Sequence, residues 1–424
     1  MHIISIDHNN IEEENSQKNS RNALADSVRS AGYQGTDAWV IWLKDIRISR
    51  LLDEMKAIDL RKENALNELE ELTRSVQTLI ESNRGGDKGI HGFIGERAQV
   101  FIKNAWALIK GSVKTSILID DNGMTDYLEN GIEYQQKACR AGGKLGLDHV
   151  LKHKQTYPFF SGRYQIPKDF YAKYAWLSKM SPEQAGRLRH EDLIIWKEIQ
   201  KVLKAGIKVE PMICTYDEIQ RDRVFDTIRQ KESDIISEAE HQVQDATERN
   251  KPTLKDGLKT TAASAAVEGA FCGAGEIWQK HREGKHIKDY TSEDAKDVGK
   301  AALIGACKGV VRGAVVYSAA NFTKIPAPAA GAAITVAFDG AIAVKQYADG
   351  KTTGAECASE IAKSAIMASA GALGAKIGRK LIPVPILGET VGGFVFSFAA
   401  SHGCKWAFKY ISDKQEGDSL PHCA

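Results

Sequence analysis

Two Asn-Gly pairs in the stretch DNGMTDYLENGIEYQQK, residues 121–137, constrain the fold of this chain more than any other local feature. An Asn-Gly pair between strand-like runs is a strong signal of a β-hairpin, because both residues tolerate the positive φ angles of a type I′ turn. The flanking runs are VKTSILID (113–120), MTDYLE (124–129) and IEYQQKAC (132–139). The sequence therefore predicts a three-stranded meander.

The segments around the meander predict a mixed α/β domain over residues 85–250. A helical period over 92–111 precedes the meander, and a helical run over 144–154 leads to the short strand GRYQIP. The expected order is α, β, β, β, α, β with a mixed sheet. A further strand over 207–214 and a long charged helix over about 216–249 complete this domain.

Two segments precede the α/β domain. Residues 1–36 are polar and rich in Asn, Ser and Glu, which predicts a poorly ordered arm. Residues 37–84 place apolar side chains at helical spacing among many charges, which indicates one long amphipathic helix or a helical hairpin. This helical segment is expected to serve in packing or dimerisation.

The last third of the chain is rich in Gly and Ala and predicts an all-α bundle over 251–412, followed by a tail over 413–424. Three weakly similar stretches begin with polar residues and continue with small residues at helical spacing: 254–275, 295–316 and 358–379. Small residues allow helix backbones to approach closely. The region therefore resembles a glycine zipper.

Charges interrupt the apolar runs of this bundle, so two interpretations stay open. Crossing a bilayer takes about 20 continuous apolar residues, whereas Lys308, Arg312 and Asp339 fall inside the runs. Residues 255–410 form either a soluble bundle or a module that inserts into membranes. A cytoplasmic location is expected, with membrane association through this region as the alternative.

The bulk composition excludes several classes of function. The formal net charge of +2 gives no global attraction to nucleic acid, so any basic surface must be local. The seven Cys residues form no C-x-x-C pair, which argues against a zinc site and a disulfide framework. The sequence holds no phosphate-binding loop, nucleophile elbow or dinucleotide fingerprint.

The meander brings side chains together that could carry chemistry. Side chains alternate along a strand, so Glu133, Gln135 and Lys137 share one face. The preceding antiparallel strand places Asp126 beside them. Oxygen ligands of this kind hold Mg²⁺, which activates water for attack on a phosphodiester, and a lysine stabilises the developing negative charge.

The order α, β, β, β, α, β, together with Asp126 and Gln135-x-Lys137, resembles the PD-(D/E)xK nuclease superfamily, which has a restriction-endonuclease-like core. The resemblance implies Asp126 as principal metal ligand, Gln135 at the second ligand position and Lys137 as catalytic lysine. It also implies Glu96 as the acid of the first helix and Mg²⁺ (or Mn²⁺) as cofactor. Gln135 departs from the pattern, because the family has an acid there, and Glu133 is expected to compensate as a ligand.

The resemblance covers about residues 90–170, and basic residues in and near that range are candidates for phosphate contacts. The expected nucleic-acid-binding residues are Lys144, Lys152, Arg163 and Lys168. A solvated helix face is the alternative interpretation of the lysines. His149 and His153 lie four residues apart on a helix, without a third metal ligand nearby in sequence.

The sequence thus favours a metal-dependent endonuclease that acts on DNA rather than RNA. Its architecture suggests a bacterial defence or mobile-element effector with protein partners of such a system, and cutting two strands suggests a homo-oligomer. The alternative is a membrane-active or scaffold protein that acts through the C-terminal helices. In that case the α/β domain is not catalytic.

Overall fold

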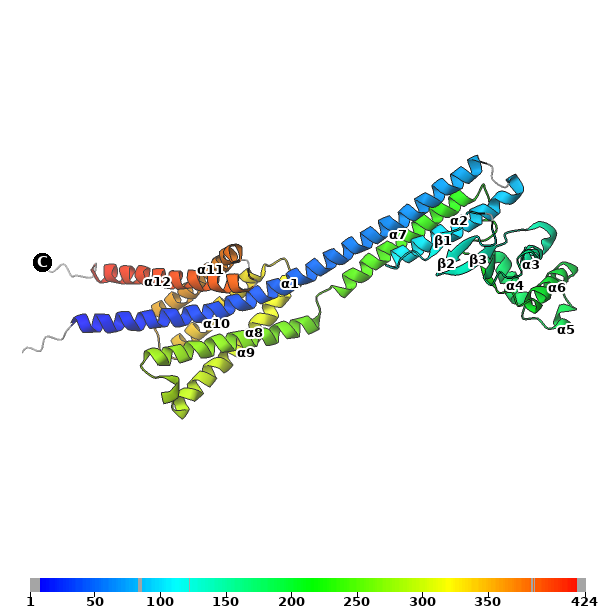
Figure 1. Ribbon diagram of the computed structural model, residues 1–424. Helices are drawn as coiled ribbons and strands as arrows, with labels where there is room; N and C mark the ends of the chain where they lie inside the picture. The colour runs from blue at the N-terminus through cyan, green and yellow to red at the C-terminus, as the bar shows by residue number, and fades with distance from the viewer. Residues whose placement is uncertain (1–7, 83–85, 122, 383, 385, 418–424) are drawn as a thin grey trace, which may run out of the picture. The chain divides into compact units, whose positions relative to one another are not determined.

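The computed structural model describes residues 8–82, 86–121, 123–382, 384 and 386–417. The chain divides into two compact units (Figure 1). The first, here called the helical unit, comprises Met1–Arg50 and Asn250–Ala424. The second, here called the sheet unit, comprises Leu51–Arg249. The division after Arg249 lies one residue before the boundary predicted after residue 250.

Helix α1 (His8–Glu81) supplies residues to both units, which differs from the predicted division into an arm and a separate helical segment. The segment 1–36, expected to be poorly ordered, is helical from its eighth residue, and residues 1–7 lie outside the described residues. The physical reason is tertiary packing, because residues 31–38 are buried in the helical unit. From Leu51 onward the same helix belongs to the sheet unit.

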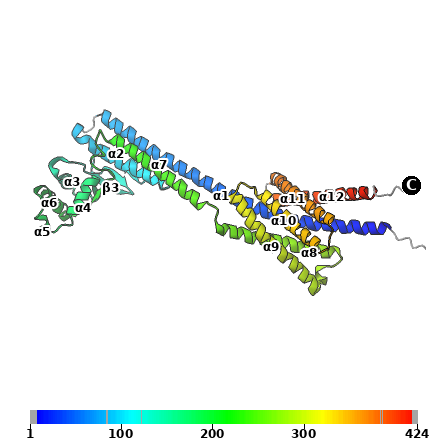
Figure 2. The same cartoon turned by 180° about the vertical axis from the view of Figure 1, so that it is seen from behind.

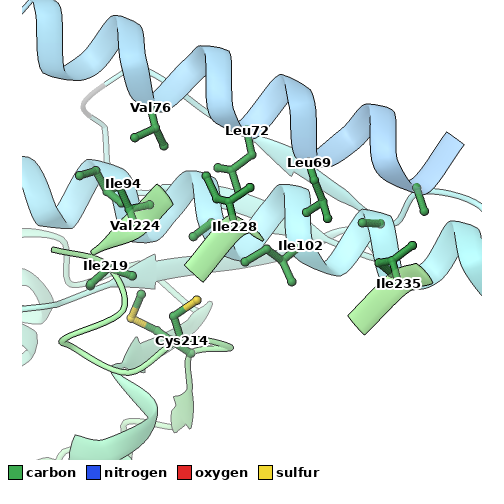
Figure 3. Packing of buried hydrophobic residues seen from close by; sticks show 14 of the residues in the cluster. Leu69, Leu72, Val76, Ile94, Ile102, Cys214, Ile219, Val224, Ile228 and Ile235 are labelled. Carbon is green, nitrogen blue, oxygen red and sulfur yellow. The ribbon is translucent and has the colours of Figure 1, made fainter. Parts of the chain in front are cut away.

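Three helices of the sheet unit pack along a shared apolar seam (Figure 3). They are α1, α2 (Gly86–Ile109) and α7 (Val224–Arg249). On α1 the buried apolar residues are Ile58, Ala65, Leu69, Leu72, Val76 and Leu79. From Ala65 onward they recur at alternating steps of four and three, as at the core positions of a coiled coil. This single continuous helix settles the choice between a long helix and a helical hairpin.

A five-stranded mixed sheet lies beside these helices, with the strands in the order β1-β2-β3-β4-β5. The strands are β1 (Ser116–Leu118), β2 (Tyr127–Glu129), β3 (Ile132–Gln136), β4 (Arg163–Ile166) and β5 (Val209–Pro211). The first three form an antiparallel meander. β3, β4 and β5 pair in parallel, so the mixed sheet expected from the sequence is present.

Helices cover both faces of the sheet. On one face, Tyr127 and Tyr134 pack with Val100 of α2, and the Tyr127 hydroxyl donates to Gln165 Oε1 over 2.7 Å. On the other face, Tyr164 belongs to an apolar cluster built with the helices that follow β3 and β4. The main helices of that cluster are α3 (Leu147–Thr156), α4 (Lys168–Leu177) and α6 (His190–Lys204).

The helical unit combines the N-terminal part of α1 with five long helices, which Figure 2 shows from behind. They are α8 (Leu254–Arg282), α9 (Ser292–Phe322), α10 (Ala327–Ala348), α11 (Gly354–Leu381) and α12 (Leu387–Gly417). Side chains of Thr253, Thr291 and Thr353 cap α8, α9 and α11. The predicted helical C-terminal region is therefore present, and α12 continues five residues into the segment expected to be a tail.

Small residues let the helix backbones of this unit approach closely, as the glycine-rich pattern predicts. A Cβ atom added at Gly309 of α9 would lie 2.4 Å from the Ser264 carbonyl oxygen of α8. A Cβ atom at Gly378 of α11 would lie 2.0 Å from the Gly388 carbonyl oxygen of α12. No larger side chain fits at either position without moving a helix.

A charged cluster lies in the interior of the helical unit. The Arg312 guanidinium donates to both carboxylate oxygens of Asp37, each over 3.3 Å, and lies 3.6 Å from Glu268 Oε1. All three side chains are buried, with 1–3% of their surface exposed. Arg312 also donates to Thr335 Oγ1 and faces the Tyr33 ring. Two buried carboxylates thus share one guanidinium.

Burial dominates the titration of these carboxylates. It raises the pKa of Glu268 to about 7 and that of Asp37 to about 6, although Arg312 opposes both shifts. A carboxyl group with a raised pKa stabilises the folded state fully below its unfolded pKa. That contribution disappears as the pH rises through the folded pKa.

We expect the Glu268→Gln variant to unfold at a higher temperature than the wild type at pH 8, because it removes a buried charge that one guanidinium must share. The free energy of unfolding should rise by about 2 kcal/mol at pH 8 and by little at pH 5, where the wild-type carboxyl is protonated. Thermal unfolding followed by circular dichroism measures both values.

The Arg312→Met variant is the opposite test, because it leaves two buried carboxylates without their counter-ion. It should lower stability at pH 8 by roughly 3–5 kcal/mol. Equal pH dependence in the wild type and Glu268→Gln would show that Glu268 does not titrate in the folded chain.

Candidate active site

The second Asn-Gly pair forms the predicted hairpin turn. Asn130 and Gly131 have φ angles of 49° and 77°, as a type I′ turn requires, and they join Glu129 to Ile132 in register. The strand pairing between β2 and β3 follows from this turn. A tight turn is therefore present at the second Asn-Gly pair, whereas the connection that contains the first pair is longer than two residues.

The first connection is a loop of eight residues, 119–126, rather than a tight two-residue turn. Asp121 Oδ1 accepts from the Gly123 backbone N–H over 2.7 Å, which curls the loop, and Asn122 lies outside the described residues. The predicted strand at 124–129 shortens to Tyr127–Glu129. The loop returns at Asp126, whose carbonyl oxygen accepts from the Ile119 N–H over 2.8 Å.

Asp126, the residue before β2, lies beside Gln135 of β3, as the sequence predicts. The Gln135 amide nitrogen donates to both Asp126 carboxylate oxygens, over 2.7 and 2.6 Å. The Gln136 backbone N–H donates to Asp126 Oδ2 over 2.5 Å. Gln135 Oε1 is buried and has no hydrogen-bond partner in the described chain. The amide at the expected acid position thus holds Asp126 and leaves one oxygen unsatisfied.

Lys137 directly follows β3, and its backbone N–H donates to the Gln165 carbonyl of β4 over 2.8 Å. Its side chain is half-buried and makes no ion pair or hydrogen bond among the described residues. Burial lowers the pKa of Lys137, while the charges of Asp126 and Glu96 counteract that shift. An unpaired ammonium thus lies in the electrostatic field of two carboxyl groups.

Glu96 of α2 belongs to the same cluster. Its pKa is raised to about 8, mainly by burial and then by the Asp126 charge, while Arg97 and Lys137 oppose the shift. Burial also raises the pKa of Asp126, against the opposing effects of Lys137 and the Gln136 and Gln135 N–H donors. Two carboxyl groups that share a site in this way resist simultaneous ionisation and attract a cation.

Two charged residues of this cluster were not among the sequence-based candidates. The Arg97 guanidinium pairs with Asp120 over 2.8 Å and donates to Ser75 Oγ of α1 over 2.9 Å. Asp120 raises the pKa of Glu96, and Arg97 lowers it. Asp120 could have been found from the sequence, because it is an acid at the end of a predicted strand. The role of Arg97 could not, because it depends on contacts with Ser75 and Asp120, which lie 22 and 23 positions away.

His153 is a buried residue of α3 that packs against Tyr164, so it does not form a metal-binding helix face with His149. Its Nδ1 atom is hydrogen-bonded to the Tyr164 hydroxyl over 2.9 Å, and the ring packs among Tyr157, Phe160 and Tyr164. The pKa of His153 is lowered to about 4, mainly by burial and in part by the Lys137 charge. The ring is therefore neutral at physiological pH, while its helical neighbour His149 is exposed.

The other predicted site residues are Glu133, Arg163 and three lysines. Glu133 is half-buried opposite Leu128, two residues nearer the hairpin turn than Gln135. Arg163 pairs with Glu210 over 2.6 Å, and it aligns with Tyr134 rather than with Gln135. Among the predicted phosphate contacts, Lys144 is half-buried, whereas Lys152 and Lys168 are exposed.

The donor set at this site suits a hard cation. Asp126, Glu96 and Gln135 Oε1 offer oxygen atoms, which Mg²⁺ and Mn²⁺ prefer. A carboxylate has about four lone-pair positions, so the three hydrogen bonds to Asp126 leave acceptor capacity. No group of three or more His, Cys, Asp or Glu side chains suited to a metal occurs among the described residues. Gln135 Oε1 adds a third side-chain oxygen to those of the two carboxyl groups.

Comparisons with protein-family models, with curated proteins and with solved structures give no significant match to this chain. The chemistry proposed for the chain therefore rests on the geometry of the sheet unit.

We expect the affinity of the protein for Mn²⁺ to rise with pH up to about 8. A proton on Glu96 competes with the cation, so each pH unit below the raised pKa should weaken binding by up to about tenfold. Titration calorimetry in buffers of different ionisation enthalpy measures the affinity and the protons released together.

The Glu96→Gln variant should lose this proton release and bind Mn²⁺ more weakly. Glu133→Gln, a matched change nearer the hairpin turn, should keep both the release and its pH dependence. Mn²⁺ binding that does not vary between pH 6 and pH 8 would exclude Glu96 from the ligand set.

Proposed function

We propose that the sheet unit is a metal-dependent nuclease that hydrolyses phosphodiester bonds, with DNA as the preferred substrate. The observation that carries the proposal is the unpaired, half-buried Lys137 in the shared field of Asp126 and Glu96. A cation-binding pair of carboxyl groups beside a free ammonium suits a negatively charged ester that gains charge during attack.

The element order gives independent support. The chain runs α2, β1, β2, β3, α3, β4, with an antiparallel meander followed by a parallel β3–β4 pair. The same order of elements underlies the resemblance to the PD-(D/E)xK superfamily. The proposed core is the part of the sheet unit from α2 to β4.

Each residue has a proposed role in this reaction. Asp126, Glu96 and Gln135 would hold Mg²⁺ or Mn²⁺, which supplies a polarised phosphate and an activated water when bound. Lys137 would stabilise the charge that develops on the phosphate oxygens. Gln135 donates to both oxygens of Asp126 and so fixes the orientation of that carboxylate.

The exposed Lys152 and Lys168, together with Lys144, are the proposed phosphate contacts along the substrate backbone. Arg163 is less suited, because Glu210 already neutralises its charge. Cleavage of both strands of a duplex would require two sites, and a homo-oligomer would supply them. A defence or mobile-element role is proposed from the joining of this unit to a helical one.

We expect the purified protein to convert supercoiled plasmid DNA to nicked and linear forms with Mg²⁺ or Mn²⁺. Asp126→Asn and Lys137→Met should each lower the rate by about 100-fold or more, because each removes a charge needed in the transition state. Gel analysis of time courses gives the rates, with an RNA substrate measured in parallel.

Lys204→Met is the matched control, since Lys204 is an exposed lysine in the last turn of α6. It should cleave like the wild type. Cleavage at the same rate by the wild type and all three variants would trace the activity to another site or to a contaminant, and the proposal would be wrong.

A further inference from the structure

The outward face of α9 is apolar between positions 303 and 315. Every exposed residue between positions 303 and 315 is uncharged and of low polarity: Leu303, Ile304, Cys307, Val310, Val311, Ala314 and Val315. The large side chains among them are 39–66% exposed. A soluble surface normally scatters such residues singly. Here they are continuous along about three helical turns.

Helix α10 has the same character. Its exposed residues before Lys345 are all aliphatic: Ala329, Ala333, Ala337, Ala341, Ile342 and Val344. Ile342 and Val344 are 46% and 52% exposed. The two helices follow one another directly, because residues 323–326 form their connection.

Among the described residues, α9 and α10 are the two helices long and apolar enough to cross a membrane. A helix of 22 residues, the length of α10, spans about 33 Å, and bilayer hydrocarbon is about 30 Å thick. In the most apolar windows of α9 and α10, only 33% and 22% of the residues are buried. A core helix of a soluble protein would be mostly buried, so packing within the chain does not account for their composition.

The three charges that interrupt the apolar runs have partners within the helical unit. Arg312 is buried against Asp37, and Lys308 lies 3.6 Å from Asp339 of α10. Asp339 also accepts from the Ser364 hydroxyl over 2.8 Å. Arg312 is thus paired in the interior of the unit, and Lys308 is paired with Asp339, whose side chain is 37% exposed.

Lysines border the apolar stretches. Lys300 precedes the exposed apolar residues of α9, Lys324 lies between the helices, and Lys345 follows those of α10. All three are exposed. Lysines at the ends of an apolar helix reach anionic lipid headgroups while the apolar side chains enter the acyl region.

We propose that the helical unit binds anionic lipid bilayers, with the outward faces of α9 and α10 entering the hydrocarbon. The proposal concerns a surface remote in sequence from the candidate active site and does not depend on nuclease activity. A second copy of the chain is the alternative occupant of the same faces, and the experiment separates lipid binding from self-association.

The full-length protein should float with vesicles of phosphatidylcholine and phosphatidylglycerol in a density gradient. The double variant Val311→Glu, Val315→Glu should lose at least about tenfold in vesicle affinity, because two carboxylates on this face must leave water. Ile236→Glu on α7 is the matched control, since Ile236 is 42% exposed outside this unit. It should float like the wild type.

Cys307 provides a second, local measurement, because it is an exposed cysteine on the proposed face. An environment-sensitive nitrobenzoxadiazole label at Cys307, with Cys139 and Cys423 replaced by serine, should shift its emission to shorter wavelength when vesicles are added. A shift that appears only on raising the protein concentration without vesicles would indicate a contact between copies and overturn the proposal. Wild-type protein that does not float would overturn it as well.

Circular dichroism and thermal unfolding should be the same for the double variant and the wild type, since both valines are exposed. If the double variant unfolds early, Leu303→Glu replaces it, because Leu303 is 66% exposed. Flotation of a folded Leu303→Glu protein at wild-type affinity would also contradict the proposal.

Discussion

The burial of α2 between α1 and α7 is the constraint on which the candidate site depends. Its apolar stripe fixes the helix in the seam of the sheet unit, and its polar side chains then hold the sheet. Asn104 bonds the Ser116 backbone through both its N–H donor and its carbonyl oxygen, over 3.0 and 3.1 Å. Gln99 accepts from the Ile213 N–H over 2.7 Å, beyond the end of β5. Because Glu96 lies on the same helix, its distance from Asp126 follows from this packing.

Local signals allowed the meander and the Asp126–Gln135 contact to be predicted, because a two-residue turn fixes the register of the strands beside it. The eight-residue loop before Asp126 could not be predicted in the same way, since its shape depends on contacts such as that of Asp121 with Gly123. The same limit applies to α1. A polar composition predicted disorder over residues 1–36, whereas the burial of Thr36 against Glu268 depends on residues 232 positions apart.

The two units achieve compactness by different means, and this difference shapes their surfaces. The sheet unit fills its seam with Ile, Leu and Val, so its large apolar residues lie mostly inside. The helical unit brings backbones together through glycine, as at Gly309 and Gly378. Narrow interfaces of this kind bury little side-chain area, so large aliphatic residues remain on the outside. Close backbone packing and an apolar exterior therefore have the same cause, which is the use of small residues at the helix interfaces.

The division of the chain also has a consequence for synthesis on the ribosome. The sheet unit is one continuous segment, Leu51–Arg249, inserted between the two parts of the helical unit. Its strands and helices can therefore pair as soon as α7 emerges. Residues 31–38 become buried only after α8 and α9 have been made, because Thr36 bonds Glu268 and Asp37 pairs with Arg312. A nascent chain thus completes the unit with the candidate catalytic residues first, while the apolar helices are still to be translated.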